Sequence, residues 1–136
     1  MKPRVYLLLF VMVFGVACGS SVSKSNTDTK TERTFNYPYS SVQAAARDAI
    51  QANGFEVTGE EPGFLTGHRP NQIGLLVGSG GENIGVWITS AGTSETKVQV
   101  VTKLTVVGVV GQRSWNDDVL KTIDEKLKAA APPEAR

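Results

Sequence analysis

The sequence predicts a small α+β domain of two layers, in which two helices cover one face of an antiparallel sheet of about five strands. Three observations predict this fold. Apolar residues recur at helical spacing in two segments, 42–50 and 119–127. Between these segments, short stretches alternate apolar and polar residues, which is typical of strands with one buried face. A lone cysteine excludes an intramolecular disulfide, so burial of apolar surface must stabilise the fold.

The charge of the chain is nearly balanced. Among its 136 residues are 14 basic and 13 acidic side chains, and removal of Lys2 and Arg4 with the first 17 residues leaves 12 against 13. Nucleic-acid-binding surfaces normally carry a strong basic excess, so we expect no nucleic-acid partner. Once the N-terminal region is set aside, about 100 residues remain, which is enough for one domain with one core.

The N-terminus has the organisation of a secretory signal peptide. After a short basic start, residues 5–14 form an uncharged apolar run, and small residues follow it. This run is shorter than the roughly 20 residues of a membrane-spanning helix. Cys18 comes directly after Gly15-Val16-Ala17, where cleavage is expected. We therefore expect residues 1–17 to be a signal peptide.

Gly15-Val16-Ala17-Cys18 resembles the lipobox of bacterial lipoproteins, with Gly15 at the position usually held by leucine. The resemblance implies that Cys18 carries a lipid anchor and that the membrane is a partner. Gly19, directly after the cysteine, resembles the sorting signal of outer-membrane lipoproteins, which implies a place in the bacterial envelope at that membrane. Gly15 and Ala17 also satisfy the small-x-small rule of ordinary signal cleavage, so a soluble secreted protein and an uncleaved membrane anchor stay open as alternatives.

The domain is expected to follow a polar segment. Residues 18–33 contain a single aliphatic side chain, Val22, and are too polar to offset the entropy of ordering. They are expected to form a flexible tether of about 20 Å. The chain would then divide into four parts: the signal peptide 1–17, the lipidated cysteine with its tether 18–33, one α+β domain 34–130, and a disordered tail 131–136.

The first strand is predicted at residues 34–37, and the first helix follows it. Ser40 or Ser41 is expected to cap this helix, and Asn53-Gly54 to end it in the left-handed conformation. Its apolar stripe is mostly alanine, so we expect the helix to lie close to the sheet. The stripe consists of Val42, Ala45, Ala46, Ala49 and Ile50.

Four strands are expected after this helix, at 55–58, 64–69, 84–89 and 95–107. In the third of them Trp87 alternates away from the apolar set and is expected on the solvent face. In the last strand one set of residues is expected to face the helices: Val98, Val100, Leu104 and Val106.

The second helix is predicted to begin with Asn116 as its cap. Asp117 and Asp118 in its first turn are stabilising there, because their negative charges lie at the positive end of the helix dipole. The expected buried stripe is Val119, Leu120, Ile123 and Leu127.

The resulting order is strand, helix, four strands, helix. With its helix exit at Gly54-Phe55, this order resembles small envelope lipoprotein domains over residues 34–130, among them the helix-grip-like domains of lipoprotein C of the barrel assembly machinery. The resemblance is one of element order and helix exit, and it transfers no site residue to this chain.

Side chains suited to catalysis or metal binding are scattered. His68 is the only histidine, and the one cysteine lies outside the domain, so no catalytic triad or metal cluster is expected. Gly78-Ser79-Gly80-Gly81 lacks the lysine and the third glycine of phosphate-binding loops. We therefore expect no enzyme, no metal and no cofactor.

The candidate binding surface is apolar. Ile73, Leu75 and Leu76 precede the glycine-rich loop, and with Trp87 they would form a mobile docking surface for an envelope protein or a lipid-like ligand. A short edge strand or a plug in a loop is the alternative for this segment, and packing beneath the segment is the alternative for Trp87.

The expected function is a lipid-anchored binding or scaffold module that faces the periplasm. A carrier of a small apolar or lipid-like ligand is the alternative, and its cavity would lie between helix and sheet. The residues expected around that cavity are Ala46, Ala49, Val100 and Leu104. A hydrolase is the third reading.

Overall fold

The computed structural model describes residues 21–26, 28, 30–73, 78–79, 81–104 and 112–131. Several sequence predictions lie outside the described residues: the signal peptide, Cys18, Leu75, Leu76, Val106 and the tail at 132–136.

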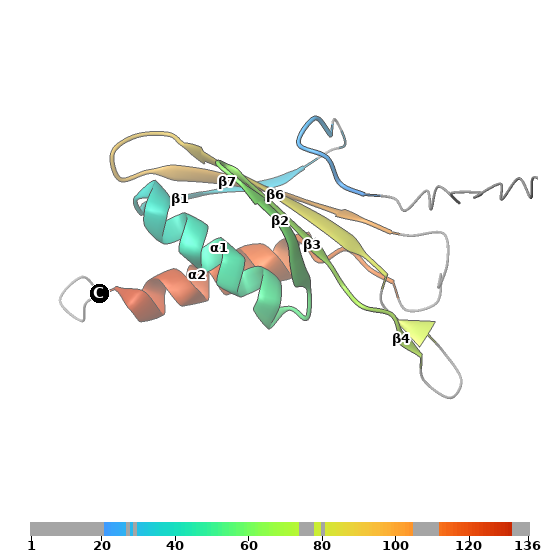
Figure 1. The fold of residues 1–136 in the computed structure, drawn as a ribbon. Coiled ribbons are helices and arrows are strands. Elements are labelled where there is room, and N and C mark those ends of the chain that lie inside the picture. Colours follow the sequence, from blue (N-terminus) through green and yellow to red (C-terminus); the bar gives the residue numbers. More distant parts are fainter. Residues whose placement is uncertain are drawn as a thin grey trace, which may run out of the picture.

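The domain has two layers, with both helices on one face of a five-stranded sheet (Figure 1). The strand order is β1-β7-β6-β3-β2, and every neighbouring pair is antiparallel. The predicted α+β class is therefore confirmed. The elements of these two layers are β1 (Thr31–Phe35), α1 (Tyr39–Ala52), β2 (Glu56–Glu61), β3 (Phe64–His68), β6 (Asn83–Ser90), β7 (Thr96–Lys103) and α2 (Asn116–Ala130).

A small hairpin extends from the sheet between β3 and β6. Its strands are β4 (Gln72–Ile73) and β5 (Gly78–Ser79), which pair with each other in a separate two-stranded sheet. Ile73 therefore belongs to this hairpin and not to an edge of the main sheet.

The core lies between the helices and the inner face of the sheet. Both predicted helical stripes are buried in full, and the inward residues of β6 and β7 meet them: Ile84, Val86, Ile88, Val98 and Val100. Ala46 and Ala49 have no exposed surface, which brings α1 close to the sheet as expected.

The end of α1 follows the sequence prediction, whereas its start does not. Gly54 has φ +82°, and the Phe55 N–H donates to the Ile50 carbonyl at 3.2 Å, which closes the helix in the predicted left-handed turn. The helix starts at Tyr39 after Pro38 and makes no side-chain capping hydrogen bond, so the prediction of Ser40 or Ser41 as the cap is wrong.

Asn116 does not cap α2. Its Nδ2 donates to Thr31 Oγ1 at 3.0 Å, and its Oδ1 accepts from Thr102 Oγ1 at 2.8 Å, so its side chain joins the helix start to β1 and β7. Thr102 Oγ1 also accepts the Trp115 N–H at 3.0 Å. The threonine that interrupts the apolar face of β7 therefore fixes the point at which α2 begins.

Leu104 is not in the core. β7 ends at Lys103, and the Leu104 side chain keeps 51% of its surface exposed. The alternation of β7 stops one residue before Leu104, so the prediction that it faces the helices is wrong.

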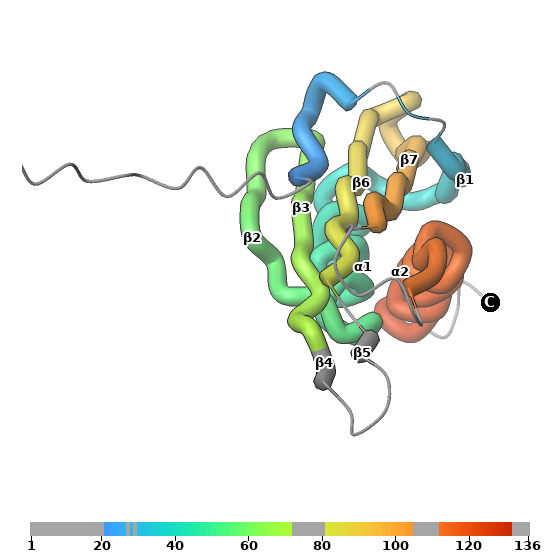
Figure 2. The backbone as a smooth tube through the Cα atoms, turned by 90° about the vertical axis from the view of Figure 1, so that its right-hand side faces the viewer, coloured from blue at the N-terminus to red at the C-terminus, as the bar shows by residue number. Residues whose placement is uncertain are grey.

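The N-terminal segment is packed on the sheet. We call the described residues 21–26, 28 and 30 the strap. Figure 1 shows the strap on the face of the sheet opposite to the helices, and Figure 2 shows it beside β3 and β6 after a quarter turn. Val22 is 7% exposed and forms a second apolar cluster with Phe64, Trp87 and Val101. The predicted flexible tether is therefore wrong for the described part of 18–33, and the first strand begins at Thr31 instead of Thr34.

Candidate functional site

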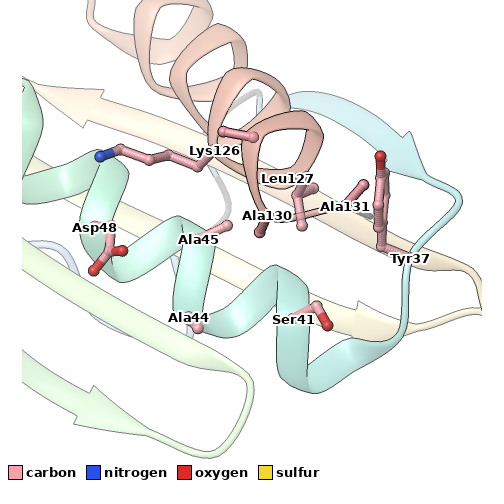
Figure 3. A pocket seen from close by; sticks show the side chains of 10 residues that line it. Tyr37, Ser41, Ala44, Ala45, Asp48, Lys126, Leu127, Ala130 and Ala131 are labelled. Atoms are coloured by element: carbon pink, nitrogen blue, oxygen red, sulfur yellow. The ribbon is translucent and has the colours of Figure 1, made fainter. Parts of the chain in front are cut away.

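A groove of about 710 Å³ opens between the start of α1 and the end of α2 (Figure 3). Figure 3 shows Tyr37 at one end of this groove and Asp48 and Lys126 at the other. The lining residues are Tyr37, Ser41, Ala44, Ala45, Asp48, Lys126, Leu127, Ala129, Ala130 and Ala131.

Alanines account for the free space. Five of the ten lining residues are alanines, from both helices and the first position after α2. A methyl side chain leaves space between the two helices, whereas leucine at the same positions would extend into it. Ala44 is exposed at the wall of the groove, while Leu127 is 2% exposed and belongs to the core as well. Ala131, expected to begin a disordered tail, donates its N–H to the Leu127 carbonyl at 3.1 Å.

The groove is suited to binding an apolar group. Its walls are mainly apolar, with hydroxyls from Tyr37 and Ser41 and charges of opposite sign from Asp48 and Lys126. Near the end of α2, the pKa of Lys128 is raised above its usual value because its ammonium donates a hydrogen bond to Asp124. This arrangement offers apolar contact and orientation by charge, without a nucleophile paired to a base.

Trp87 lies on the outer face of the sheet, as its alternation predicted, but it does not form an open surface. It is 8% exposed, and its Nε1 donates to the Lys24 carbonyl of the strap at 2.9 Å. Its ring packs against Phe64 at a centroid distance of 4.8 Å, and the Lys30 ammonium lies 3.9 Å from its centroid. The expectation that Trp87 serves as a docking residue is wrong for this structure, because the strap covers it.

The other members of the candidate binding surface cannot be located beside Trp87. Ile73 is in β4, but its side chain, like Leu75 and Leu76, lies outside the described residues. The proposed carrier cavity between helix and sheet is occupied by packed side chains at three of its four positions. Ala46, Ala49 and Val100 have no exposed surface and belong to one core cluster.

A buried polar cluster lies at the other end of α1, and no sequence pattern predicts it. Glu82 has no exposed surface, and its Oε1 accepts from Trp115 Nε1 at 3.3 Å and lies 3.8 Å from Arg69 Nη1. Two guanidiniums lie over the Trp115 ring, that of Arg69 at 4.4 Å and that of Arg113 at 3.8 Å from its centroid. Sequence signals were weak here, because Glu82 stands beside a glycine-rich loop and Arg69 before a proline.

This cluster has a structural role that its contacts explain. Arg69 is the residue after β3, Glu82 the residue before β6, and Trp115 the residue before α2, so together they join sheet and helix. Phe55 adds an edge-to-face contact with Trp115 at 5.9 Å. Glu82 Oε2 and Arg69 Nε have no hydrogen-bond partner among the described residues.

His68 is half-buried on the outer face, where its Nδ1 and Asn83 Oδ1 are 3.0 Å apart. Within the described ranges, no group of three or more His, Cys, Asp or Glu side chains converges as a metal site. No helix in the described part of the chain is long and apolar enough to cross a membrane.

No protein-family model and no curated protein matches the chain. Among solved structures, it is similar to TTHA0849 from Thermus thermophilus, with a TM-score of 0.40 and 11% identity over 76% of this chain and 99% of that one. It is also similar to StfQ, a di-domain ARO/CYC protein of the steffimycin biosynthetic pathway, with a TM-score of 0.43 and 13% identity over 79% of this chain and 46% of that one. Both likenesses are distant, and neither assigns a function to this chain.

Proposed function

We propose that this chain is a lipid-anchored protein of the bacterial envelope that binds a protein partner through the groove between α1 and α2. The observation that carries the proposal is that the strap lies on the face of the sheet opposite to the helices (Figure 1), whereas the groove is lined by residues of those helices. The strap would connect a lipidated Cys18 to the outer face of the sheet. The helices and the groove between them would then face the periplasm.

The proposed occupant is an apolar segment of an envelope protein. The alanine-lined groove can receive large apolar side chains that α1 and α2 do not supply. Asp48 and Lys126 stand at one end of the groove and are both exposed, so they can pair with charges that flank such a segment and fix its direction.

A small apolar ligand is the second candidate occupant. The volume of about 710 Å³ lies within the range of small-molecule sites. In this case the protein would be a carrier, with its ligand between the two helices instead of between helix and sheet.

A groove-filling substitution tests the binding site. Ala44→Leu puts a larger side chain into the groove from an exposed position, and Lys121→Leu adds the same side chain to an exposed position of α2 outside it. A photoreactive residue in place of Ala130 should crosslink to one envelope protein in cells. Ala44→Leu should remove that crosslink, and Lys121→Leu should retain it.

The same variants distinguish a protein segment from a small apolar ligand as the occupant of the groove. If the purified protein binds a fluorescent fatty acid and Ala44→Leu abolishes the binding, the carrier function is supported instead. The groove is not the binding site if Ala44→Leu leaves both the crosslink and the probe binding unchanged.

The anchor has its own test. Cys18→Ser should move the protein from the membrane fraction to the soluble fraction and remove the mass of the lipid from the mature chain. Retention in the membrane with an unchanged mass would contradict lipidation and indicate that the apolar run at 5–14 is the anchor.

A further inference from the structure

The strap is held on the outer face of the sheet by contacts at several points along its length. Lys24 accepts the Trp87 Nε1–H at 2.9 Å through its carbonyl, and its ammonium donates to the Pro62 carbonyl at 3.2 Å. Asp28 pairs with Lys103 of β7 at 3.3 Å. These contacts run from the turn between β2 and β3 to β7, so the strap crosses the sheet.

Val22 marks the point where this strap meets the middle of the sheet. It packs over Gly85 of β6, which is the central strand in the order β1-β7-β6-β3-β2. A Cβ at Gly85 would lie 2.4 Å from Val22 Cγ1, so glycine is what allows this close approach.

The chain between Val22 and Cys18 is short. The two residues are four positions apart in the sequence, and four residues span at most about 14 Å when fully extended. A lipidated cysteine would lie at the level of the lipid head groups, so the centre of the outer face would lie within about 14 Å of them.

This length is too short for the helical layer to turn toward the bilayer. Adjacent strands lie about 4.8 Å apart, so either edge of the sheet is roughly 10 Å from the central strand. A path around that edge to the outer side of the helices adds about 10 Å more, the diameter of a helix with its side chains. The total exceeds the reach of the four residues.

We infer that the outer face of the sheet, around the strap, is the surface that lies against the phospholipid bilayer. This inference rests on the proposed lipidation of Cys18 and adds an orientation to it. The domain would sit on the head groups with α1 and α2 directed away, instead of at the end of a flexible tether.

Head-group quenching measures this orientation in the lipidated, full-length protein. A fluorophore is attached to Thr89→Cys on the outer face of β6, or to Gln51→Cys on α1; both positions are exposed. A lipidated Cys18 is a thioether and does not react with the label. The protein is placed in vesicles of phosphatidylethanolamine and phosphatidylglycerol that contain a lipid with a spin-labelled head group. Quenching at Thr89→Cys should be several-fold stronger than at Gln51→Cys.

A longer linker provides the matched control. Ten glycine and serine residues between Ser21 and Val22 should weaken the quenching at Thr89→Cys and remove the difference between the two positions. Equal quenching of both labels in the protein with the natural linker overturns the orientation while the lipid mass on Cys18 is intact. Absence of the lipid mass overturns the proposed anchoring, and the orientation with it.

Discussion

Gly85→Ala should release the strap while leaving the domain folded. The new methyl group would lie 2.4 Å from Val22 Cγ1 and 2.9 Å from Trp87 Cη2, distances that van der Waals contact does not permit. Gly85 faces outward, whereas its neighbours Ile84 and Val86 face the core, so the clash is confined to the outer face. Val22 must therefore move away from the sheet.

The change in the free energy of strap opening follows from the contacts that Val22 and Lys24 would lose. Burial of a valine side chain contributes roughly 1.5–3 kcal/mol. The hydrogen bond from Trp87 Nε1 to the Lys24 carbonyl adds about 0.5–1.5 kcal/mol. A loss of about 2–4.5 kcal/mol corresponds to a roughly 30- to 1,600-fold increase in the equilibrium constant for opening the strap.

Limited proteolysis with trypsin measures this opening. Lys24 and Lys30 are cleavage sites within the strap, and cleavage of an opened segment follows its equilibrium population when closing is fast. Gly85→Ala should therefore be cleaved at these sites faster by a comparable factor. Thr89→Ala is the matched control, because it changes an exposed outer residue of the same strand.

Combining Val22→Ala with Gly85→Ala tests whether the clash with Val22 causes the release of the strap. Val22→Ala removes the atom closest to the new methyl group, so Gly85→Ala should have a smaller effect in the Val22→Ala background than in the natural chain. If Gly85→Ala is cleaved at the natural rate, Val22 does not pack on Gly85 and the description of the strap is refuted. A large fall in the global unfolding free energy would also contradict the separation of strap and core.

Three further predictions concern the free energy of unfolding in urea. Leu65→Ala should lower the free energy of unfolding by about 2–5 kcal/mol because Leu65 has no exposed surface, whereas Leu104→Ala should change that free energy by less than about 0.5 kcal/mol. The opposite ranking would contradict the placement of β7 and its end. Glu82→Leu should lose at most about 3–5 kcal/mol because it leaves Arg69 without its carboxylate, and adding Arg69→Met should recover most of this loss; no recovery would show that the pair is not coupled. Asn116→Ala should lose about 1–3 kcal/mol with its two side-chain hydrogen bonds, and a change near zero would argue that water replaces them.

The buried polar cluster illustrates what sequence patterns leave out. Arg69 and Glu82 are 13 positions apart, and Trp115 follows much later, so no local periodicity relates them. The pairing of β3 with β6 brings the first two together, since the Arg69 N–H donates to the Glu82 carbonyl at 2.9 Å beyond the last paired residues. Packing of α2 against the sheet then brings Trp115 to Glu82.

The groove could be predicted only in part. Alanine at positions 44 and 45 and at 129–131 is visible in the sequence and indicates low side-chain volume. Whether small side chains produce a close contact or a gap depends on the distance between the helices. At Ala46 and Ala49 the same residue type is fully buried, whereas Ala44 lines open space.

By itself the sequence determined the elements whose signals are local. The stripes of both helices, the alternation of Ile84, Val86 and Ile88 in β6 and the stop at Asn53-Gly54 each depend on the preferences of neighbouring residues for one backbone geometry, and these features are found as predicted. Only the tertiary structure decided the position of the strap. A polar segment with one valine has no reason to order alone, and Val22 is buried because β3, β6 and β7 together present Phe64, Trp87 and Val101 around the bare backbone of Gly85. That surface exists only after strands distant in sequence have paired, so the order of the strap depends on contacts that no local pattern records.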